Sequence, residues 1–266
     1  YDAILLNSPK LTKESINPKN NKVKIVSRFG VGYDSVDLDV LKNNNIILTN
    51  TPNAVRRPVA IASLTMILSL SGKLMIKDNL VRKGLGNDRT NHMGVGLTKK
   101  TLGIVGFGGI GREFVKISKG LFKNIICYDP FVGKEEMKNL QVDKVDFDEI
   151  ANSSDFLVIL CDLNEKTRGM IDSTFLNKMK SSSYLINLSR GPVVNENDLI
   201  ASLKQNKISG AGLDVMTNEP IEENNELLNL KNTVNIVFFK LSSSFFSSIG
   251  SFVLTSNPAP EILFCF

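Results

Sequence analysis

Short apolar runs separated by polar turns open the chain. Strands are predicted over 1–7, 23–37 and 44–52. The second of them runs into a glycine loop, and the third stops at a proline. The longest apolar run follows, and it predicts a helix from Pro58 to about Leu85. A polar, glycine-dotted stretch over 83–97 then predicts an exposed loop.

From Thr101 the pattern changes, and short, almost wholly apolar runs alternate with amphipathic stretches. Strands are predicted over 101–108, 124–130, 155–161, 183–189 and 210–215. Helices are predicted over 111–122, 146–153, 173–180 and 196–207. Strands that are apolar on both faces and joined by helices are typical of a parallel sheet with helices on both sides. The predicted fold class is therefore α/β, with a Rossmann-type doubly wound parallel sheet.

The first strand of this half runs into a glycine-rich turn, GIVGFGGIG, with the spacing G-x-G-x-x-G. In a dinucleotide-binding turn the first glycine (Gly106) allows the tight turn, and the second (Gly108) lets a pyrophosphate approach the backbone. The third (Gly111) packs the helix against the strand. The spacing alone is weak, so a glycine turn without a ligand stays open as the alternative.

An acid at the end of the next strand favours the dinucleotide interpretation. Asp129 follows that strand about twenty residues after the turn, as the dinucleotide-binding pattern requires. We expect its carboxylate to accept hydrogen bonds from the ribose hydroxyls of NAD. Pro130 and Phe131 come next, with no arginine to bind a 2′-phosphate, so the sequence predicts NAD rather than NADP.

Three further charged residues follow later strands. Arg190 comes after the predicted strand at 183–189, at the carboxyl edge of the sheet, where ligand sites of α/β proteins lie. An arginine there can bind a carboxylate through two parallel hydrogen bonds, or it can cap a turn at the surface. Asp214 and Glu219 follow the last predicted strand. Two acids near a nucleotide crevice can orient a base or bind a polar ring substituent, and both can equally be solvated loop residues.

Taken together, the motifs resemble those of the D-isomer-specific 2-hydroxyacid dehydrogenases. FGVGYDSVD, KTLGIVGFGGIGRE, INLSRGPVVNENDLI and ISGAGLDV occur here in the order and spacing of that family. The resemblance runs from Tyr1 to about Val234. It implies the NAD-dependent interconversion of a 2-keto acid and a D-2-hydroxy acid by hydride transfer. It also implies two domains, one Rossmann-like and one a flavodoxin-like substrate domain that is present only in part.

The resemblance also implies a role for each matching residue. Arg190 matches the arginine that binds the carboxylate and the keto oxygen of the substrate, and Glu219 matches the glutamate that holds the imidazole of the catalytic histidine. Asp214 matches the aspartate beside the nicotinamide carboxamide. The backbone at Val31 and Gly32 matches the cradle for the substrate carboxylate. The predicted cofactor-binding residues are Gly106, Gly108, Gly109, Ile110, Asp129 and Asp214.

The catalytic histidine of the family is missing from this sequence. Counting from Glu219 as in the family leads to Phe238 and Phe239, where a Pro-His pair would stand. His92 is the only histidine and lies in the predicted loop before the glycine turn. Lys240 is adjacent to the expected position and titratable, but a lysine is not expected to replace the histidine. Because a ketone that accepts hydride needs a proton donor, we expect an impaired enzyme.

The expected domains follow from these assignments. A partial substrate-binding domain is expected over 1–52, an NAD-binding domain with an interdomain helix over 53–236, and an aberrant tail over 237–266, where serine and phenylalanine alternate. The family's first strand and helix, and its closing helix, are expected to be absent.

The composition limits the classes of partner that we expect. The net charge is +5, but the lysines are scattered among acids, so nucleic acid is not expected as a partner. One histidine and three cysteines without ligand spacing predict no metal, and cysteines in apolar runs favour a reducing, cytoplasmic compartment. The longest apolar run is too short to span a bilayer, so no membrane is expected. We also expect a homodimer that acts on a small 2-keto or 2-hydroxy acid.

Two functions remain open from the sequence. One is an oxidoreductase of the family, and the other is an NAD-binding module without catalysis that acts as a sensor or interaction protein. Arg190 and Glu219 favour the oxidoreductase, because a site that no longer works is free to lose them.

Overall fold

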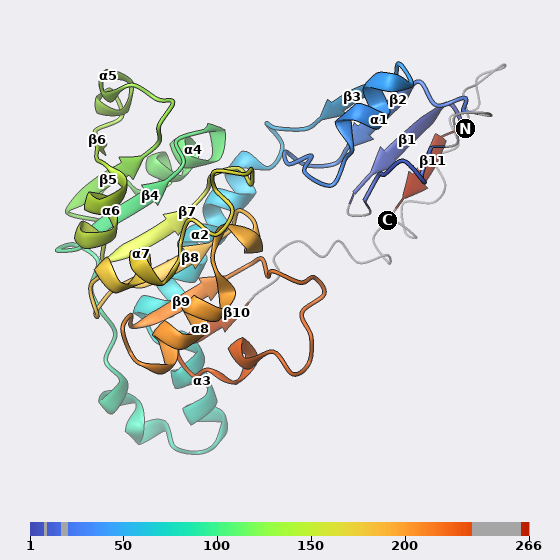
Figure 1. The fold of residues 1–266 in the computed structure, drawn as a ribbon. Coiled ribbons are helices and arrows are strands. Elements are labelled where there is room, and N and C mark those ends of the chain that lie inside the picture. Colours follow the sequence, from blue (N-terminus) through green and yellow to red (C-terminus); the bar gives the residue numbers. More distant parts are fainter. Residues whose placement is uncertain (8–9, 17–20, 236–261, 266) are drawn as a thin grey trace. The chain divides into compact units, whose positions relative to one another are not determined.

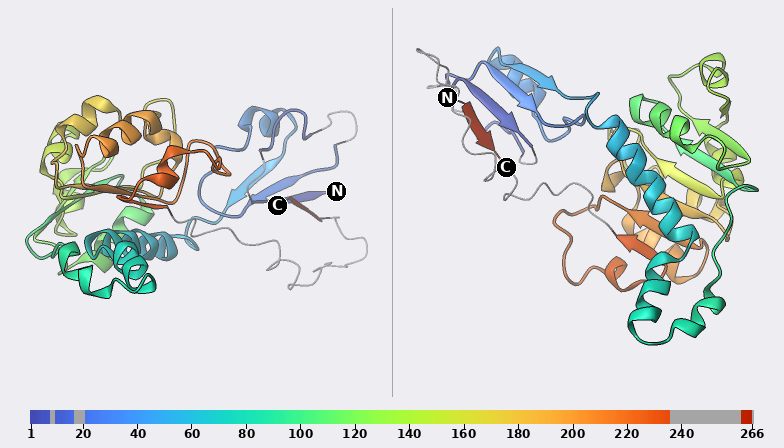
Figure 2. Two further views of the ribbon diagram at one scale, coloured as in Figure 1. Left: turned by 90° about the horizontal axis from the view of Figure 1, so that it is seen from below. Right: turned by 180° about the vertical axis from the view of Figure 1, so that it is seen from behind.

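The computed structural model describes residues 1–7, 10–16, 21–235 and 262–265, which form two compact units (Figure 1). The first unit holds residues 1–55 together with the strand at 262–265, and the second begins at Arg56. Figure 2 shows the two units from two further sides. Each unit has a parallel sheet of its own. That the first binds substrate and the second binds NAD stays a prediction about the domains.

The sheet of the first unit has four parallel strands in the order β11-β1-β2-β3. Their bounds are β1 Ala3–Leu6, β2 Ile25–Arg28, β3 Ile47–Asn50 and β11 Ile262–Cys265. The first three lie inside the strands predicted at the start of the chain, as their short apolar runs require.

One helix, α1 (Leu38–Asn43), connects β2 to β3. It begins at Asp37, whose carboxylate accepts the backbone N–H of Val40 at 3.0 Å and so satisfies one of the unpaired donors of the first turn. Val40 and Leu41 on this helix pack with Val26 of β2 in the core of the first unit. The unit is thus a strand–helix–strand arrangement with its own small apolar core.

The second unit contains a seven-stranded parallel sheet in the order β10-β9-β8-β7-β4-β5-β6. The strands are β4 Thr101–Val105, β5 Asn124–Tyr128, β6 Asp143–Lys144, β7 Phe156–Ile159, β8 Tyr184–Asn187, β9 Gly210–Leu213 and β10 Thr233–Asn235. The chain runs outward from β4 in one direction through β5 and in the other through β7. This is the doubly wound order, which confirms the predicted fold class, and its switch point lies between β4 and β7.

Helices cover both faces of this sheet (Figures 1 and 2). One core cluster joins α2 (Arg56–Ser71) and α4 (Gly109–Ser118) to one face of the strands, and a second joins α6 (Phe147–Ser153), α7 (Ser173–Lys178) and α8 (Glu196–Lys204) to the other. All four residues of β7, β8 and β9 are buried. Burial on both faces is the reason that these strands are apolar throughout. The remaining helices are α3 Leu74–Arg82, η1 Gly86–His92, α5 Lys134–Lys138, η2 Gly191–Val193 and η3 Glu226–Asn229.

The long helix predicted from Pro58 to about Leu85 is wrong in one respect, because the structure divides it into α2 and α3. Lys73 between them has a φ of +51°, and the two helices meet at 59°. The carbonyl of Ser71 accepts the backbone N–H of Val95 at 2.8 Å, which replaces the helical bond that a longer α2 would make. Part of the predicted exposed loop is itself helical, since η1 lies within it.

Among the described helices, no single one is long and apolar enough to cross a membrane. The bent pair α2 and α3 passes a test of length and composition only when the two are taken together.

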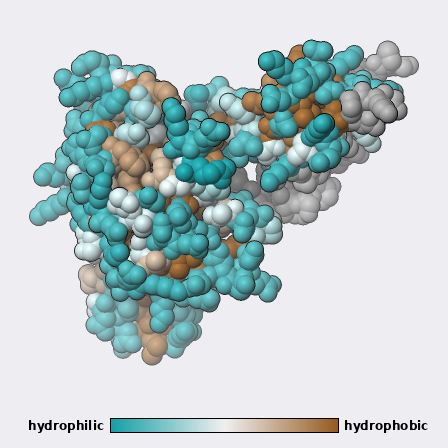
Figure 3. Space-filling model, viewed as in Figure 1, coloured by the Kyte–Doolittle hydropathy of each residue, from teal (hydrophilic) through white to brown (hydrophobic). Residues whose placement is uncertain are grey.

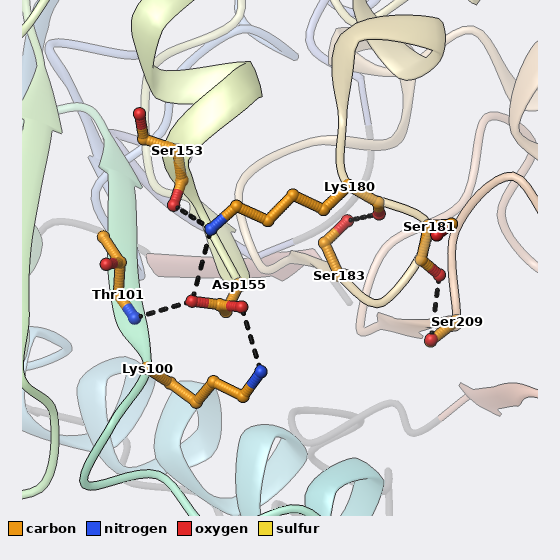
Figure 4. Close-up of polar contacts among 8 residues, drawn as sticks. All are labelled: Lys100, Thr101, Ser153, Asp155, Lys180, Ser181, Ser183 and Ser209. Carbon is orange, nitrogen blue, oxygen red and sulfur yellow. Dashed lines mark hydrogen bonds and ion pairs between the residues drawn. The ribbon is translucent and has the colours of Figure 1, made fainter.

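A buried acid lies at the amino edge of the second sheet, where β7 begins (Figure 4). Asp155 is 8% exposed, and its carboxylate accepts the backbone N–H of Thr101 at 2.9 Å. Lys100 approaches it at 3.1 Å and Lys180 at 3.4 Å. Burial by itself would raise the pKa of Asp155, but the hydrogen bond from Thr101 and the two lysines outweigh it and lower the pKa below its usual 3.8.

We expect Asp155→Asn to lower the free energy of unfolding by about 1–3 kcal/mol at neutral pH, because the lysines then face no carboxylate. The measurement is urea unfolding followed by circular dichroism. Since the folded pKa is lowered, the stabilisation is present at pH values above 3.8 and is lost as the pH falls through the folded pKa. The difference between the two proteins should therefore shrink in acid.

The matched control is Asp148→Asn, which removes a carboxylate that pairs with Lys178 at 2.6 Å. The side chain of Asp148 is 65% exposed, so its loss should cost less than about 1 kcal/mol. Equal losses in the two variants would show that the cluster at Asp155 is no more than a surface ion pair.

Candidate nucleotide and substrate site

The glycine turn begins directly after β4, at the switch point of the sheet. Gly106 has a φ of +103°, a conformation that L side chains rarely adopt. A Cβ atom there would lie 2.7 Å from the backbone nitrogen of Cys161, which follows β7. Gly106 therefore has to be glycine on two grounds, its backbone conformation and the close approach of the neighbouring chain.

Gly108 differs from the other two glycines of the turn. It caps the N-terminus of α4 with a φ of −74°, which any residue can adopt. A Cβ atom added to it meets no atom of the described chain within 4 Å. Neither the backbone nor packing within the protein explains the missing side chain. The bare backbone leaves space at a helix N-terminus, the kind of site that binds phosphate.

Gly111, in the first turn of α4, is required by packing. A Cβ atom at this position would overlap the carbonyl oxygen of Gly106. The three glycines thus have the three separate geometries that the dinucleotide turn requires, namely a tight turn, an open backbone and a close helix–strand contact. Gly109 and Ile110 lie between them in the same first turn of α4. Contact of these residues with the cofactor stays a prediction.

Asp129 follows β5 and is tied to the glycine turn. One carboxylate oxygen, Oδ2, accepts the backbone N–H of Phe107 at 2.7 Å. The other, Oδ1, accepts the N–H groups of Phe131 at 2.8 Å and Val132 at 3.3 Å. A carboxylate oxygen can accept about two hydrogen bonds, so Oδ2, which accepts one, keeps capacity for a ribose hydroxyl. Loss of this carboxylate would therefore loosen the turn as well as remove the predicted ribose contact.

Arg190 follows β8 at the carboxyl edge of the same sheet. Its Nη1 donates to the carbonyl of Ser189 at 2.8 Å, and its own carbonyl accepts a hydrogen bond from the side chain of Asn187 at 2.9 Å. Asn187 is 1% exposed, and its Oδ1 also accepts the N–H and the hydroxyl of Ser189. A buried amide with all these contacts holds the backbone at Arg190 in one conformation.

Asp214 and Glu219 come after β9, which pairs with β8. The backbone N–H of Asp214 donates to the carbonyl of Asn187 at 3.1 Å, so Asp214 is bonded to the end of the strand that precedes Arg190. Glu219 is exposed, and its carboxylate accepts the N–H of Met216 at 3.1 Å. A Cβ atom at Gly191 would overlap the backbone of Met216. The loops of Arg190 and of Glu219 are therefore in direct contact.

Val31 and Gly32 belong to the first unit, in the loop after β2. The side chain of Asn50 donates to the carbonyl of Val31 at 2.9 Å. Thr51 bonds both backbone groups of Gly30, with its hydroxyl accepting the N–H and its N–H donating to the carbonyl, each at 2.9 Å. The end of β3 therefore holds this loop, and its predicted role in substrate binding stays a prediction.

The positions expected for the catalytic pair, Phe238 and Phe239, lie outside the described residues, as does Lys240. His92 is the last residue of η1, between α3 and β4. Cys161 follows β7 near the glycine turn, and burial raises the pKa of its thiol to about 12. A thiol that stays protonated at neutral pH is a poor nucleophile. No group of three or more His, Cys, Asp or Glu side chains in the described part of the chain could hold a metal ion.

Sequence reasoning missed two residues of this region. Asn187 lies inside an apolar strand, where a polar residue with buried partners is the signal that was available. Arg56, the first residue of α2, has its side chain against Gly109 of the turn. In the sequence, Arg56 precedes Arg57 and Pro58 at the start of a predicted helix, and nothing there distinguishes it from an exposed helix-terminal residue.

Comparison with known proteins gives the family of the chain. Residues 64–237 match the family described as "D-isomer specific 2-hydroxyacid dehydrogenase, NAD binding domain". The chain belongs to this family. The resemblance drawn from the motifs is confirmed. The predicted cofactor, NAD, is confirmed as well, because the matched family domain is an NAD-binding domain.

Relatives of known sequence are D-2-hydroxyacid dehydrogenases of more than one kind. The chain is 38% identical over 219 residues to a glyoxylate reductase of Thermococcus litoralis, covering 80% of this chain and 66% of that protein. It is 34% identical over 235 residues to a D-3-phosphoglycerate dehydrogenase of Archaeoglobus fulgidus, covering 88% of this chain. The match covers only 44% of the Archaeoglobus protein, so the chain spans less than half of that relative.

Solved structures confirm the fold. A D-lactate dehydrogenase from Aquifex aeolicus, complexed with NAD and lactic acid, superposes with a TM-score of 0.81 at 28% identity and covers 89% of this chain and 75% of that one. An acyclic imino acid reductase in complex with NADPH and D-Arg has a TM-score of 0.80 at 27% identity, covering 92% of this chain and 78% of that one. The relatives thus include proteins with either form of the cofactor, so the preference for NAD over NADP stays a prediction.

The glycine geometry predicts opposite effects for two similar substitutions. Gly108→Ala should leave the free energy of unfolding within about 0.5 kcal/mol of the original, because its Cβ meets no protein atom. It should weaken NADH binding at least about tenfold, because the methyl group occupies the space of the pyrophosphate. Gly111→Ala should instead lower stability by about 1–3 kcal/mol through its overlap with Gly106.

The two quantities are measured by urea unfolding and by titration of NADH fluorescence. Unchanged NADH affinity in a fully stable Gly108→Ala protein would mean that no phosphate approaches the backbone at Gly108.

Proposed function

We propose that the chain is an NAD-dependent oxidoreductase that interconverts a 2-keto acid and a D-2-hydroxy acid by hydride transfer. The observation that carries this is the arrangement at one sheet edge of the second unit. The open glycine turn follows β4, and the contacting loops of Arg190 and Glu219 follow β8 and β9. Ligand sites of doubly wound sheets lie at this edge.

The proposed work of the chain is to hold and orient the two reactants. The bound nicotinamide would supply the hydride. Arg190 presents a permanently charged, planar group that can hold the carboxylate and the keto oxygen of a small acid. The buried amide of Asn187 fixes the backbone that carries it. The backbone at Val31 and Gly32 is proposed to bind a substrate carboxylate, as the family resemblance implies, and Asp214 the carboxamide of the cofactor.

The proton step is proposed to be impaired. When a ketone accepts hydride, the oxygen needs a proton, and loss of a general acid typically costs about 10²–10⁴-fold in rate. Glu219 is exposed and is the residue expected to hold a histidine, but the sequence has Phe238 and Phe239 where that histidine would stand. The missing histidine also favours the second candidate function, a non-catalytic NAD-binding module.

Compartment and assembly are also proposals. Cys127 and Cys161 are free, which supports a reducing cytoplasm. Large exposed apolar side chains gather on α2, α3 and the segment after them, namely Ile61, Leu68, Leu74, Met75, Val81, Leu85 and Met93. Figure 3 shows brown and tan atoms in the lower part of the view, around α3. Such a surface supports a homodimer.

The test of the proposed function compares the chain with a version in which the residues from Phe238 onward are replaced by family sequence with a Pro-His pair. Both should bind NADH, and both should prefer it to NADPH. The repaired protein should oxidise NADH with glyoxylate about 10²–10⁴ times faster, because a proton donor is restored. The measurements are NADH fluorescence and the loss of absorbance of NADH. If the repaired protein binds NADH and reduces no 2-keto acid, the non-catalytic module is the correct function.

Arg190 provides a second prediction. In the repaired protein with NADH bound, Arg190→Lys should weaken the binding of oxamate, a substrate mimic, about ten- to a hundredfold, because a point charge cannot replace two parallel hydrogen bonds. NADH affinity should change little. The matched control is Arg168→Lys, which alters an exposed arginine in a turn. Equal oxamate affinity in all three proteins would leave Arg190 as an arginine that only caps a turn.

A further inference from the structure

The side chain of Arg56 lies over the first turn of α4. A Cβ atom built on Gly109 would overlap Nε of Arg56 and would lie 2.9 Å from its Cζ and 3.1 Å from its Cδ. Gly109 follows Gly108, whose backbone is open, at the N-terminus of a ten-residue helix. Because residue 109 has no side chain, the guanidinium of Arg56 can lie directly against the glycine turn.

The charge of Arg56 is not neutralised by the protein, in contrast to its neighbours. Arg57 pairs with Glu113 at 2.8 Å, and Arg112 of α4 pairs with Glu136. Within the described residues, the side chain of Arg56 makes neither an ion pair nor a hydrogen bond. Of these three arginines, only Arg56 has no ion-pair partner among the described residues.

The position of this charge is unfavourable for the fold alone. Arg56 and Arg57 open α2, whose first turn has no acidic residue, and cations at a helix N-terminus oppose the helix dipole. The N-terminus of α4 adds a second positive end beside the same guanidinium. Two helix N-termini and an unpaired arginine therefore converge, and an anion between them would relieve all three.

We propose that Arg56 binds the pyrophosphate of the dinucleotide together with the open backbone at Gly108. The proposal rests on NAD binding at the glycine turn. Two buried residues of α2, Ala60 and Met66, anchor this helix in the core cluster that also contains β4 and α4. The backbone of Arg56 is thus carried by a helix that packs in the core beside the glycine turn.

The test compares Arg56→Gln with Arg57→Gln, which alters the adjacent arginine of the same helix turn. Arg56→Gln should weaken NADH and ADP-ribose about tenfold or more, because a charge-assisted contact to phosphate is lost. The loss should shrink as salt is raised, since salt screens an exposed charge. Arg57→Gln should change both affinities less than about twofold. Both variants should shift the midpoint of thermal unfolding only slightly, because both arginines are exposed and an exposed charge contributes little to stability.

Gly109→Ala gives an independent measurement, because its methyl group would overlap the guanidinium. In the original protein it should weaken NADH by displacing Arg56, and in the Arg56→Gln protein it should have little further effect. Full additivity of the two losses would show that they act separately, and would overturn the proposal.

The outcomes separate this proposal from the proposed function. If the original protein binds neither NADH nor ADP-ribose, dinucleotide binding itself is wrong, and Arg56 has no pyrophosphate to bind. If the original binds both and Arg56→Gln binds them equally well, the assignment of Arg56 is wrong and the proposed function stands.

Discussion

The approach of α4 to β4 without any side chain between them is the constraint on which the nucleotide-binding unit depends. A Cβ atom at Gly111 would overlap the carbonyl oxygen of Gly106, and one at Gly106 would lie 2.7 Å from the backbone nitrogen of Cys161. Three stretches of backbone, from β4, α4 and the end of β7, therefore meet at distances that only glycine permits. The short turn between β4 and α4 contains Gly108, whose backbone is open. The carboxylate of Asp129 holds the residue between, Phe107, by its N–H.

The two edges of the seven-stranded sheet differ in whether their charged side chains are paired within the protein. At the amino edge, Asp155 is buried, and two lysines and a backbone N–H satisfy it within the protein (Figure 4). At the carboxyl edge, the arginine at the start of α2 is left without a carboxylate partner among the described residues. The first arrangement stabilises the fold, and its partners are complete without a ligand. The second is unfavourable until an anion arrives, which is the arrangement expected of a binding site.

Much of this could be predicted from the sequence, because the decisive signals are local. Strands such as β7 and β8 are apolar at every position except Asn187, since the sheet buries both their faces, and the glycine spacing of the turn reflects three local geometries. What could not be predicted depends on contacts between distant segments. The break after α2 is set by the N–H of Val95, and the place of Arg56 is set by the packing of α2 on α4. Neither contact has a periodicity or a spacing that one sequence can reveal.

The choice between an enzyme and a binding module depends on which residues of the site are supported by the core and which lie beyond the edge of the sheet. Arg190 is held by a residue of the core, Asn187. Burying an amide is costly unless its hydrogen bonds are made. Here they are made to the segment that carries Arg190. The position expected for the catalytic histidine comes after β10, and β10 is the edge strand of the described sheet. A change beyond an edge strand leaves the strands inside it paired as before. Binding of a dinucleotide and of a small acid can therefore persist whatever stands at Phe238 and Phe239. Whether the chain also catalyses then depends on a proton donor for the keto oxygen when the carbon accepts hydride.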